Sequence, residues 1–94
     1  MALKLNEQQL KDIERMAGYF FTTHELAIII GCDADDLEEE LGNPRSNITK
    51  AVMKGRLQAE ADIRASVFDL AKHGSAPAQA QALDMIERFK DMED

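Results

Sequence analysis

Apolar residues recur along the chain at intervals of three and four positions, which is the spacing of one face of an α-helix. The first such segment predicts a helix over residues 6–20, and Asn6 is suited to cap its N-terminus. Its apolar face consists of Leu10, Ile13, Ala17 and Phe20. No segment alternates apolar and polar residues over a useful length, as a half-buried strand does. The chain is therefore expected to be all-α.

A short second helix is predicted at about residues 23–30. Thr22 and Glu25 have the spacing of a capping box, in which each side chain accepts a hydrogen bond from the other residue's backbone N–H. Gly31 follows the apolar run LAIII and is suited to the left-handed conformation that ends many helices.

A third helix is predicted over residues 34–41. Asp33 can cap it, with Asp36 in the reciprocal position, and Gly42 follows its end. The second and third predicted helices together carry the residues that a helix-turn-helix requires. These are a small residue where the helices cross, a glycine in the turn, and core residues on both helices. These residues are Leu26, Ala27, Gly31 and Leu37.

A long fourth helix is predicted to begin at Ser46, because the helical pattern continues from there to a His-Gly-Ser turn at residues 73–75. Gly55 lies inside this helix and predicts a bend or a close contact with another helix. The serine of the turn can cap a last helix, which is expected to fold back on the long one and to fray at residues 91–94.

The predicted fold is thus all-α, with a small helix-turn-helix-like N-terminal cluster followed by a long antiparallel helical hairpin. We place the cluster at residues 1–43 and the hairpin, as the oligomerisation region, at residues 44–94, within one compact domain. A chain of 94 residues has a thin core, so oligomerisation is expected.

The composition, with 45% hydrophobic and 31% charged residues, is that of a folded soluble protein. Cys32 is the single cysteine, which excludes an internal disulfide framework and is typical of a reducing compartment. The longest apolar run is far shorter than the ~20 residues of a membrane-spanning helix, and no signal peptide is recognised at the N-terminus. We therefore expect a cytoplasmic protein that does not interact with membranes.

The net charge of −7 argues against indiscriminate binding to nucleic acid, but the charges are segregated. Residues 33–42 contain six acids and no base, whereas residues 43–74 have an excess of basic residues. Basic character is therefore concentrated on the long helix.

The long helix has two faces that differ in character. At about 100° per residue, one stripe is apolar and is predicted to be buried; it consists of Ile48, Val52, Ala59, Ile63, Val67 and Leu70. The opposite side gathers Lys50, Lys54, Arg64 and Lys72, with Leu57, Ala61 and Phe68 interleaved. This second face is either a solvated basic surface with exposed apolar residues or an interface for protein or phosphate.

No motif for metal binding or catalysis is present. His24, Cys32 and His73 do not have the spacing of a zinc site or of a nucleophile with its base, and the acidic segment departs from a calcium-binding loop. Phosphate-binding glycine loops and the common hydrolase motifs are also missing from the sequence. We therefore predict a protein that is not an enzyme and requires no cofactor or metal.

Taken together, these segments resemble the small subunit of tailed-phage terminases, the DNA-packaging proteins. The N-terminal helix-turn-helix of that family is similar to FFTTHELAIIIGCDADDLEEEL, and the segment that follows it is similar to NPRSNITKAVMKGRLQAEADIRASVFDLAKHGSAPAQAQALDMIERF. The resemblance implies an oligomeric, ring-forming and non-catalytic factor that binds viral DNA. It also implies that the factor recruits the large terminase subunit, and that the chain acts in the cytoplasm of a bacterial host as a phage or prophage product.

The sequence departs from the family pattern in the second helix of the motif, because residues 34–41 offer only acidic side chains where base reading uses Arg, Lys, Asn or Gln. We therefore expect weak, salt-sensitive binding of double-stranded DNA through phosphates. The candidate phosphate-binding residues are Arg45, Lys50, Lys54, Arg56, Lys4 and Lys11. The candidate residues for an oligomer or partner interface are Leu57, Ala61, Phe68 and Met53. The alternatives are an acidic helical protein-interaction module and a small helix-turn-helix regulator without a packaging role.

Overall fold

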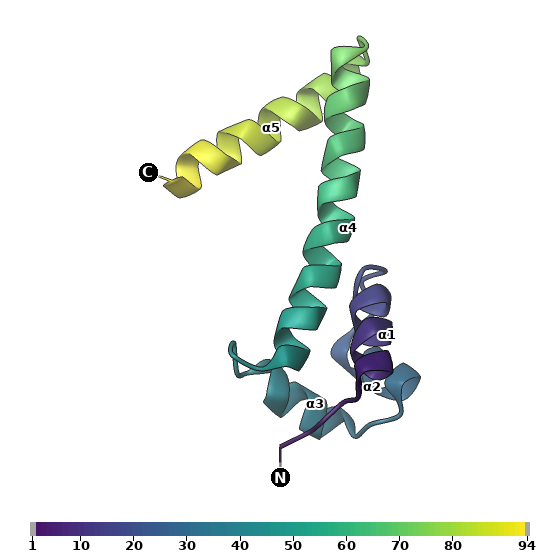
Figure 1. Cartoon of the computed structure of the whole chain (residues 1–94). Helices are drawn as coiled ribbons and strands as arrows, with labels where there is room; N and C mark the ends of the chain where they lie inside the picture. The colour runs from purple at the N-terminus through teal and green to yellow at the C-terminus, as the bar shows by residue number, and fades with distance from the viewer. Residues whose placement is uncertain (1, 94) are drawn as a thin grey trace. The chain divides into compact units, whose positions relative to one another are not determined.

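The computed structural model describes residues 2–93, which form five α-helices and no strand (Figure 1). The helices are α1 (Glu7–Ala17), α2 (Thr23–Ile30), α3 (Ala34–Leu41), α4 (Asn47–Lys72) and α5 (Ala76–Glu93). The prediction of an all-α fold is confirmed. None of these helices is long and apolar enough to cross a membrane. The contacts divide the chain into two compact units, Met1–Glu60 and Ala61–Asp94, so that α4 contributes to both.

The first two helices of the N-terminal unit begin with the capping residues that the sequence predicted. The Asn6 side chain accepts a hydrogen bond from the Gln9 N–H at 2.8 Å, and the Gln9 side chain accepts one from the Asn6 N–H at 3.0 Å. Thr22 and Glu25 form the same reciprocal pair at α2. These caps satisfy backbone N–H groups that have no partner within the helix, and they fix where each helix starts.

At α3 the cap is simpler than predicted. The Asp33 side chain accepts a hydrogen bond from the Asp36 N–H at 3.1 Å, but the Asp36 carboxylate makes no return bond to Asp33. The turn between α2 and α3 depends on Gly31, whose φ of 85° lies in the left-handed region, where a residue with a side chain is strained.

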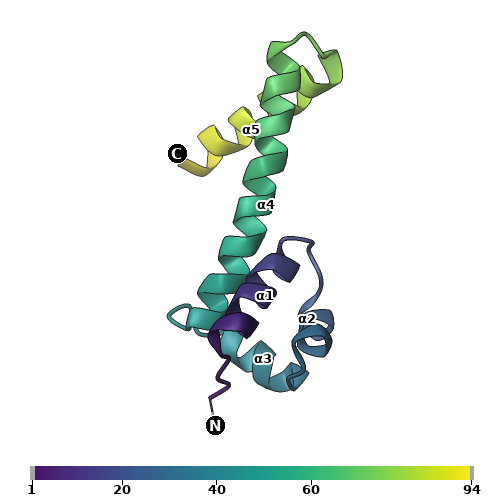
Figure 2. The same ribbon diagram turned by 45° about the vertical axis from the view of Figure 1, so that its right-hand side comes forward.

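The core of the N-terminal unit is assembled from all four of its helices (Figure 2). Leu26 and Ala27 of α2 and Leu37 of α3 are fully buried, which is the packing that the helix-turn-helix spacing predicted. They are joined by two residues of α1 and two of α4, namely Ile13, Ala17, Ile48 and Val52.

The N-terminal half of α4 is held in this unit by polar contacts as well as by apolar packing. The Ser46 hydroxyl oxygen accepts a hydrogen bond from the Ile48 N–H at 3.1 Å, as expected of the residue that starts the helix. The buried Thr49 hydroxyl donates to the carbonyl oxygen of Glu40 at 2.9 Å and ties α4 to the end of α3. These contacts lie within the compact unit Met1–Glu60.

Gly55 lies where α4 crosses α1, and the predicted close helix contact is confirmed. A Cβ atom at Gly55 would stand 1.9 Å from the carbonyl oxygen of Glu14, so only glycine allows this approach. A Cβ at Gly18 would in turn stand 3.1 Å from the carbonyl oxygen of Gly55. The two helices therefore pack backbone against backbone at this point.

The first helix is shorter than predicted, and its end is irregular. α1 stops at Ala17 with Gly18 as its C-cap, and Phe20 has a φ of 62°, in the left-handed region. Phe20 is therefore not on the apolar face of α1 and is exposed instead. The prediction was wrong here because the three-residue spacing from Ala17 to Phe20 mimics a helix, whereas the chain leaves the helix at the glycine.

In the C-terminal unit, α5 follows the end of α4 through a tight turn in which Gly74 has a φ of 98°. The Ser75 hydroxyl oxygen accepts from the Ala78 N–H at 3.4 Å, and the Gln79 side chain donates to the carbonyl oxygen of Ala71 at 3.1 Å. Beyond these contacts α5 turns back but diverges from the adjoining part of α4 instead of lying along it (Figures 1 and 2). Residues 91–93, predicted to fray, remain helical.

Because α5 diverges, part of the apolar stripe of α4 has no cover within the unit. Ile63 and Leu70, predicted to be buried, are 62% and 56% exposed. The prediction was wrong for these two residues, whereas Val67 of the same stripe and Phe68 of the opposite side are half-buried. Ala78 and Ala82, near the turn, are the buried residues of α5.

Candidate nucleic-acid interface

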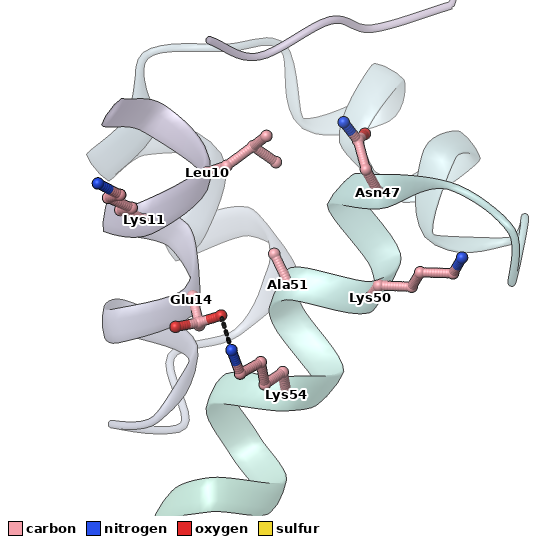
Figure 3. Close-up of a pocket in the computed structure, with 7 residues that line it drawn as sticks. All are labelled: Leu10, Lys11, Glu14, Asn47, Lys50, Ala51 and Lys54. Carbon is pink, nitrogen blue, oxygen red and sulfur yellow. Dashed lines mark ion pairs between the residues drawn. The ribbon is translucent and has the colours of Figure 1, made fainter. Parts of the chain in front are cut away.

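A shallow groove of about 270 Å³ lies between α1 and the first half of α4 and brings together three of the six predicted phosphate-binding residues. Lys11 comes from α1, and Lys50 and Lys54 come from successive turns of α4 (Figure 3). The other lining residues are Leu10, Glu14, Asn47 and Ala51. The sequence did not reveal that the α1 lysine and the α4 lysines lie beside the same groove, because that depends on how the two helices pack.

The groove has an apolar floor and a charged rim. Leu10 and Ala51 face each other across it, while the side chains of Lys11 and Lys50 extend outward on opposite sides (Figure 3). The ammonium groups are therefore spread along the surface and do not converge on one point. This arrangement suits contacts to separate phosphates of a nucleic-acid backbone better than a pocket for a single phosphate.

Lys54 is engaged with an acid at the rim. Its Nζ lies 3.6 Å from Oε1 of Glu14, and the lysine side chain is 72% exposed. An exposed ion pair of this kind contributes only about 0.2–1 kcal/mol, so a phosphate can replace the Glu14 carboxylate at small cost. The Glu14 carboxylate also reduces the positive potential of the groove, so the binding of nucleic-acid phosphates there is expected to be weak.

The other three candidates lie elsewhere on the N-terminal unit. Arg45 is exposed in the turn before α4, where its backbone N–H donates to the Asn43 side chain at 3.1 Å. Lys4 lines a separate pocket that also contains Glu40. Arg56 is half-buried, and its guanidinium donates to the carbonyl oxygen of Phe21 at 3.4 Å, so this residue holds the loop after α1.

The exposed side of α3 is acidic. Asp35, Asp36, Glu38 and Glu39 are all exposed, and within the described residues none of them forms an ion pair. Phosphates on either side of a major groove would repel such a helix. The position that reads bases in a helix-turn-helix protein is therefore chemically unsuited to DNA in this chain.

The candidate interface residues of α4 are accessible to different degrees. Met53, Leu57 and Ala61 are exposed, whereas Phe68 is half-buried beside α5. Sequence reasoning missed a second set of exposed apolar residues on α5, and their spacing of three positions was the signal that could have found them. These residues are Leu83, Ile86, Phe89 and Met92.

No side-chain cluster suited to a metal ion occurs among residues 2–93. Burial raises the pKa of the Cys32 thiol, and the nearby charges of Asp33 and Asp36 raise it further. Cys32 packs against the core and is therefore a poor nucleophile at neutral pH.

Comparison of the chain with protein-family models, curated proteins and solved structures found no match.

Proposed function

We propose that this chain is a non-catalytic, oligomeric DNA-binding protein of the terminase small-subunit type. In this role it would hold viral DNA through phosphate contacts and recruit the large terminase subunit for genome packaging in the cytoplasm of a bacterial host. The observation that carries the proposal is the group of exposed lysines from α1 and α4 beside one groove of a helix-turn-helix-like unit.

The mode of DNA binding follows from the charges. Lys11, Lys50 and Lys54 are exposed and carry long flexible side chains, which suits electrostatic contact with phosphates. Each phosphate that a lysine neutralises contributes about −0.9 to the slope of the logarithm of the association constant against the logarithm of the salt concentration, so three contacts give a slope near −3. One copy therefore binds weakly, and several copies in an oligomer bind more tightly because they engage the same duplex together.

The test is duplex binding by a variant that carries Lys50→Glu with Lys54→Glu, measured by fluorescence anisotropy at low salt. We expect its affinity to fall at least tenfold, because two phosphate contacts become repulsive. The matched control carries Arg15→Glu with Arg88→Glu, which changes the net charge equally at two exposed sites outside the groove. Equal binding by the parent and the lysine variant, with circular dichroism showing both folded, would refute the phosphate role of the groove.

A second candidate function is supported by the acids of α3. Their exposure makes this helix an alternative docking face for a basic protein partner, with no DNA involved. DNA binding at low salt, measured for the parent and for a variant with Glu38→Gln and Glu39→Gln, distinguishes the two functions. If the proposed function is right, the variant binds DNA at least as well as the parent, because the repulsion between the acids and DNA is reduced. A parent that does not bind DNA at low salt favours the alternative.

A further inference from the structure

We propose that Tyr19 and Phe20, in the loop between α1 and α2, form a stacking surface for unpaired bases of DNA. The protein would then bind DNA that has a single-stranded or frayed end more tightly than uniform duplex. The inference rests on the proposed function, since the lysines of the groove would hold the phosphates of the same strand. It concerns the N-terminal unit alone.

Two aromatic side chains of this loop lie open to solvent. Tyr19 is 68% exposed and Phe20 is 56% exposed. Phe20 also has a φ of 62°, a left-handed conformation that bulky residues rarely adopt, because their Cβ crowds the following carbonyl group. Since more than half of Phe20 is exposed, packing within the chain does little to offset this strain. An exposed aromatic residue held in a strained conformation points to contact with a ligand.

The loop is anchored at both ends although its two rings are exposed. The backbone N–H groups of Tyr19 and Phe20 donate to carbonyl oxygens in the last turn of α1, at 3.0 and 2.9 Å. The next residue, Phe21, packs against the core, and its carbonyl oxygen accepts a hydrogen bond from the Arg56 guanidinium at 3.4 Å. The Tyr19 ring meets the Phe21 ring edge to face, with 6.5 Å between their centroids. Aromatic groups that are already fixed in place lose little conformational entropy when a ligand stacks on them.

The loop begins where the lysine groove ends. A Cβ atom at Gly18, the first residue after α1, would stand 3.1 Å from the carbonyl oxygen of Gly55, which directly follows Lys54 on α4. Glu14, the acid paired with Lys54, lies one helical turn before Gly18, whose N–H donates to its carbonyl oxygen at 3.3 Å. The loop and α4 accordingly lie side by side in both views of the chain (Figures 1 and 2). A phosphate held at Lys54 would therefore bring the adjoining bases of a strand to the two exposed rings.

Cations beside exposed aromatic rings are the combination that binds single-stranded nucleic acid. The basic groups contact phosphates, and the rings stack on any base, because every base has a π-face. In a duplex the base faces are covered by neighbouring pairs, so a ring reaches them only at an end or where the strands separate. Acids near the loop include Glu14, paired with Lys54, and Glu25, whose carboxylate accepts a hydrogen bond from the Thr22 N–H. Their charges weaken phosphate binding, so stacking contributes a larger share of the affinity.

The first experiment uses the fluorescence of Tyr19, because the chain contains one tyrosine and no tryptophan. The probes are an oligodeoxythymidine strand, an abasic strand of the same length and a blunt duplex of that length, each titrated at low salt. We expect the thymidine strand to quench the emission and to bind at least about fivefold more tightly than the abasic strand, which carries the same phosphates without bases. The duplex should quench far less, because only its two ends expose base faces.

The second experiment removes one ring from the protein. Glycine adopts a φ of 62° without strain, so Phe20→Gly should remain folded by circular dichroism while losing the ring. We expect its affinity for the thymidine strand to fall about fivefold or more and its affinity for the duplex to stay the same. The matched control is Phe89→Ala, which removes a similarly exposed ring from α5, outside the N-terminal unit, and should leave both affinities unchanged.

The possible outcomes separate this inference from the proposed function. Equal binding of the thymidine and abasic strands, or equal binding of the thymidine strand by the parent and Phe20→Gly, would overturn the inference. Duplex binding without quenching by the thymidine strand would overturn it and leave the proposed function standing. Quenching by the thymidine strand without duplex binding would support it and remove the proposed function. A parent that binds none of the probes would overturn both and assign the exposed rings to contact with a protein.

Discussion

Replacing Gly55 with alanine is expected to destabilise the N-terminal unit by separating α1 from α4. The new Cβ would stand 1.9 Å from the carbonyl oxygen of Glu14 and 2.8 Å from the carbonyl carbon, whereas a normal contact needs about 3.5 Å. The atoms it meets belong to the backbone of α1 and cannot rotate away, so the helices must move apart. Overpacking of this kind costs about 1–3 kcal/mol, and the higher helix propensity of alanine returns about 1 kcal/mol.

Because the clash is severe and involves backbone atoms, the upper end of the overpacking cost applies. We therefore expect Gly55→Ala to lower the free energy of unfolding by about 2 kcal/mol and the melting temperature by roughly 4–8 °C per kcal/mol. The assay is urea denaturation followed by circular dichroism at one fixed protein concentration, because self-association would contribute to stability. Gly42→Ala is the matched control, since Gly42 is exposed with a φ of −73°, which alanine adopts readily. A Cβ at Gly42 would stand 3.2 Å from the carbonyl oxygen of Glu39, a far milder contact than the one at Gly55. A Gly55→Ala variant as stable as the parent would refute the backbone contact between the two helices.

Two further predictions concern polar contacts of the same unit. Thr49→Val removes the donor to the Glu40 carbonyl while nearly keeping the side-chain shape. We therefore expect urea denaturation to show a free energy of unfolding lower by about 0.5–1.5 kcal/mol. An unchanged free energy of unfolding would mean that this bond does not tie α4 to α3. The hydrogen bond from the Thr22 N–H lowers the pKa of the Glu25 carboxyl below its ordinary value of 4.5. The hydrogen bond to the ionised carboxylate therefore stabilises the fold above pH 4.5, and this stabilisation is lost as the pH falls through the lowered pKa. The stability difference between the parent and Glu25→Gln should therefore shrink in acid, and a difference of equal size at neutral and acid pH would contradict this.

The sequence predicted those features of the fold that local hydrogen bonds determine. α2 and α3 begin and end at the predicted residues, because their capping side chains and the glycine turn lie within a few residues of the helix ends they define. α1 was predicted too long, because the pattern of apolar spacing continued into a loop in which Phe20 adopts a left-handed conformation. Gly18 was a local signal for the end of the helix, but nothing in the residue type of Phe20 marks a left-handed conformation.

The candidate site was less predictable, because it depends on contacts between distant residues. Lys50 and Lys54 share a side of α4 by periodicity alone, but the approach of Lys11 required the close packing of α1 at Gly55. The hydrogen bond from Arg56 to Phe21 spans 35 positions and was equally inaccessible to pattern reasoning. Apolar periodicity predicted that Ile63 is buried, but the structure leaves it exposed, because α5 does not cover that side of α4.

The exposed acids of α3 separate into two groups with different physical consequences. Asp35 and Asp36 lie in the first turn, where the partial positive charge of the helix N-terminus stabilises them. Glu38 and Glu39 lie nearer the C-terminal end, where the dipole opposes negative charge, so helix stability does not account for them. On the proposed function these glutamates would repel a duplex from the usual reading helix, and DNA would approach the lysines of α1 and α4 instead. The helix-turn-helix would then position a neighbouring basic surface and would not read bases itself.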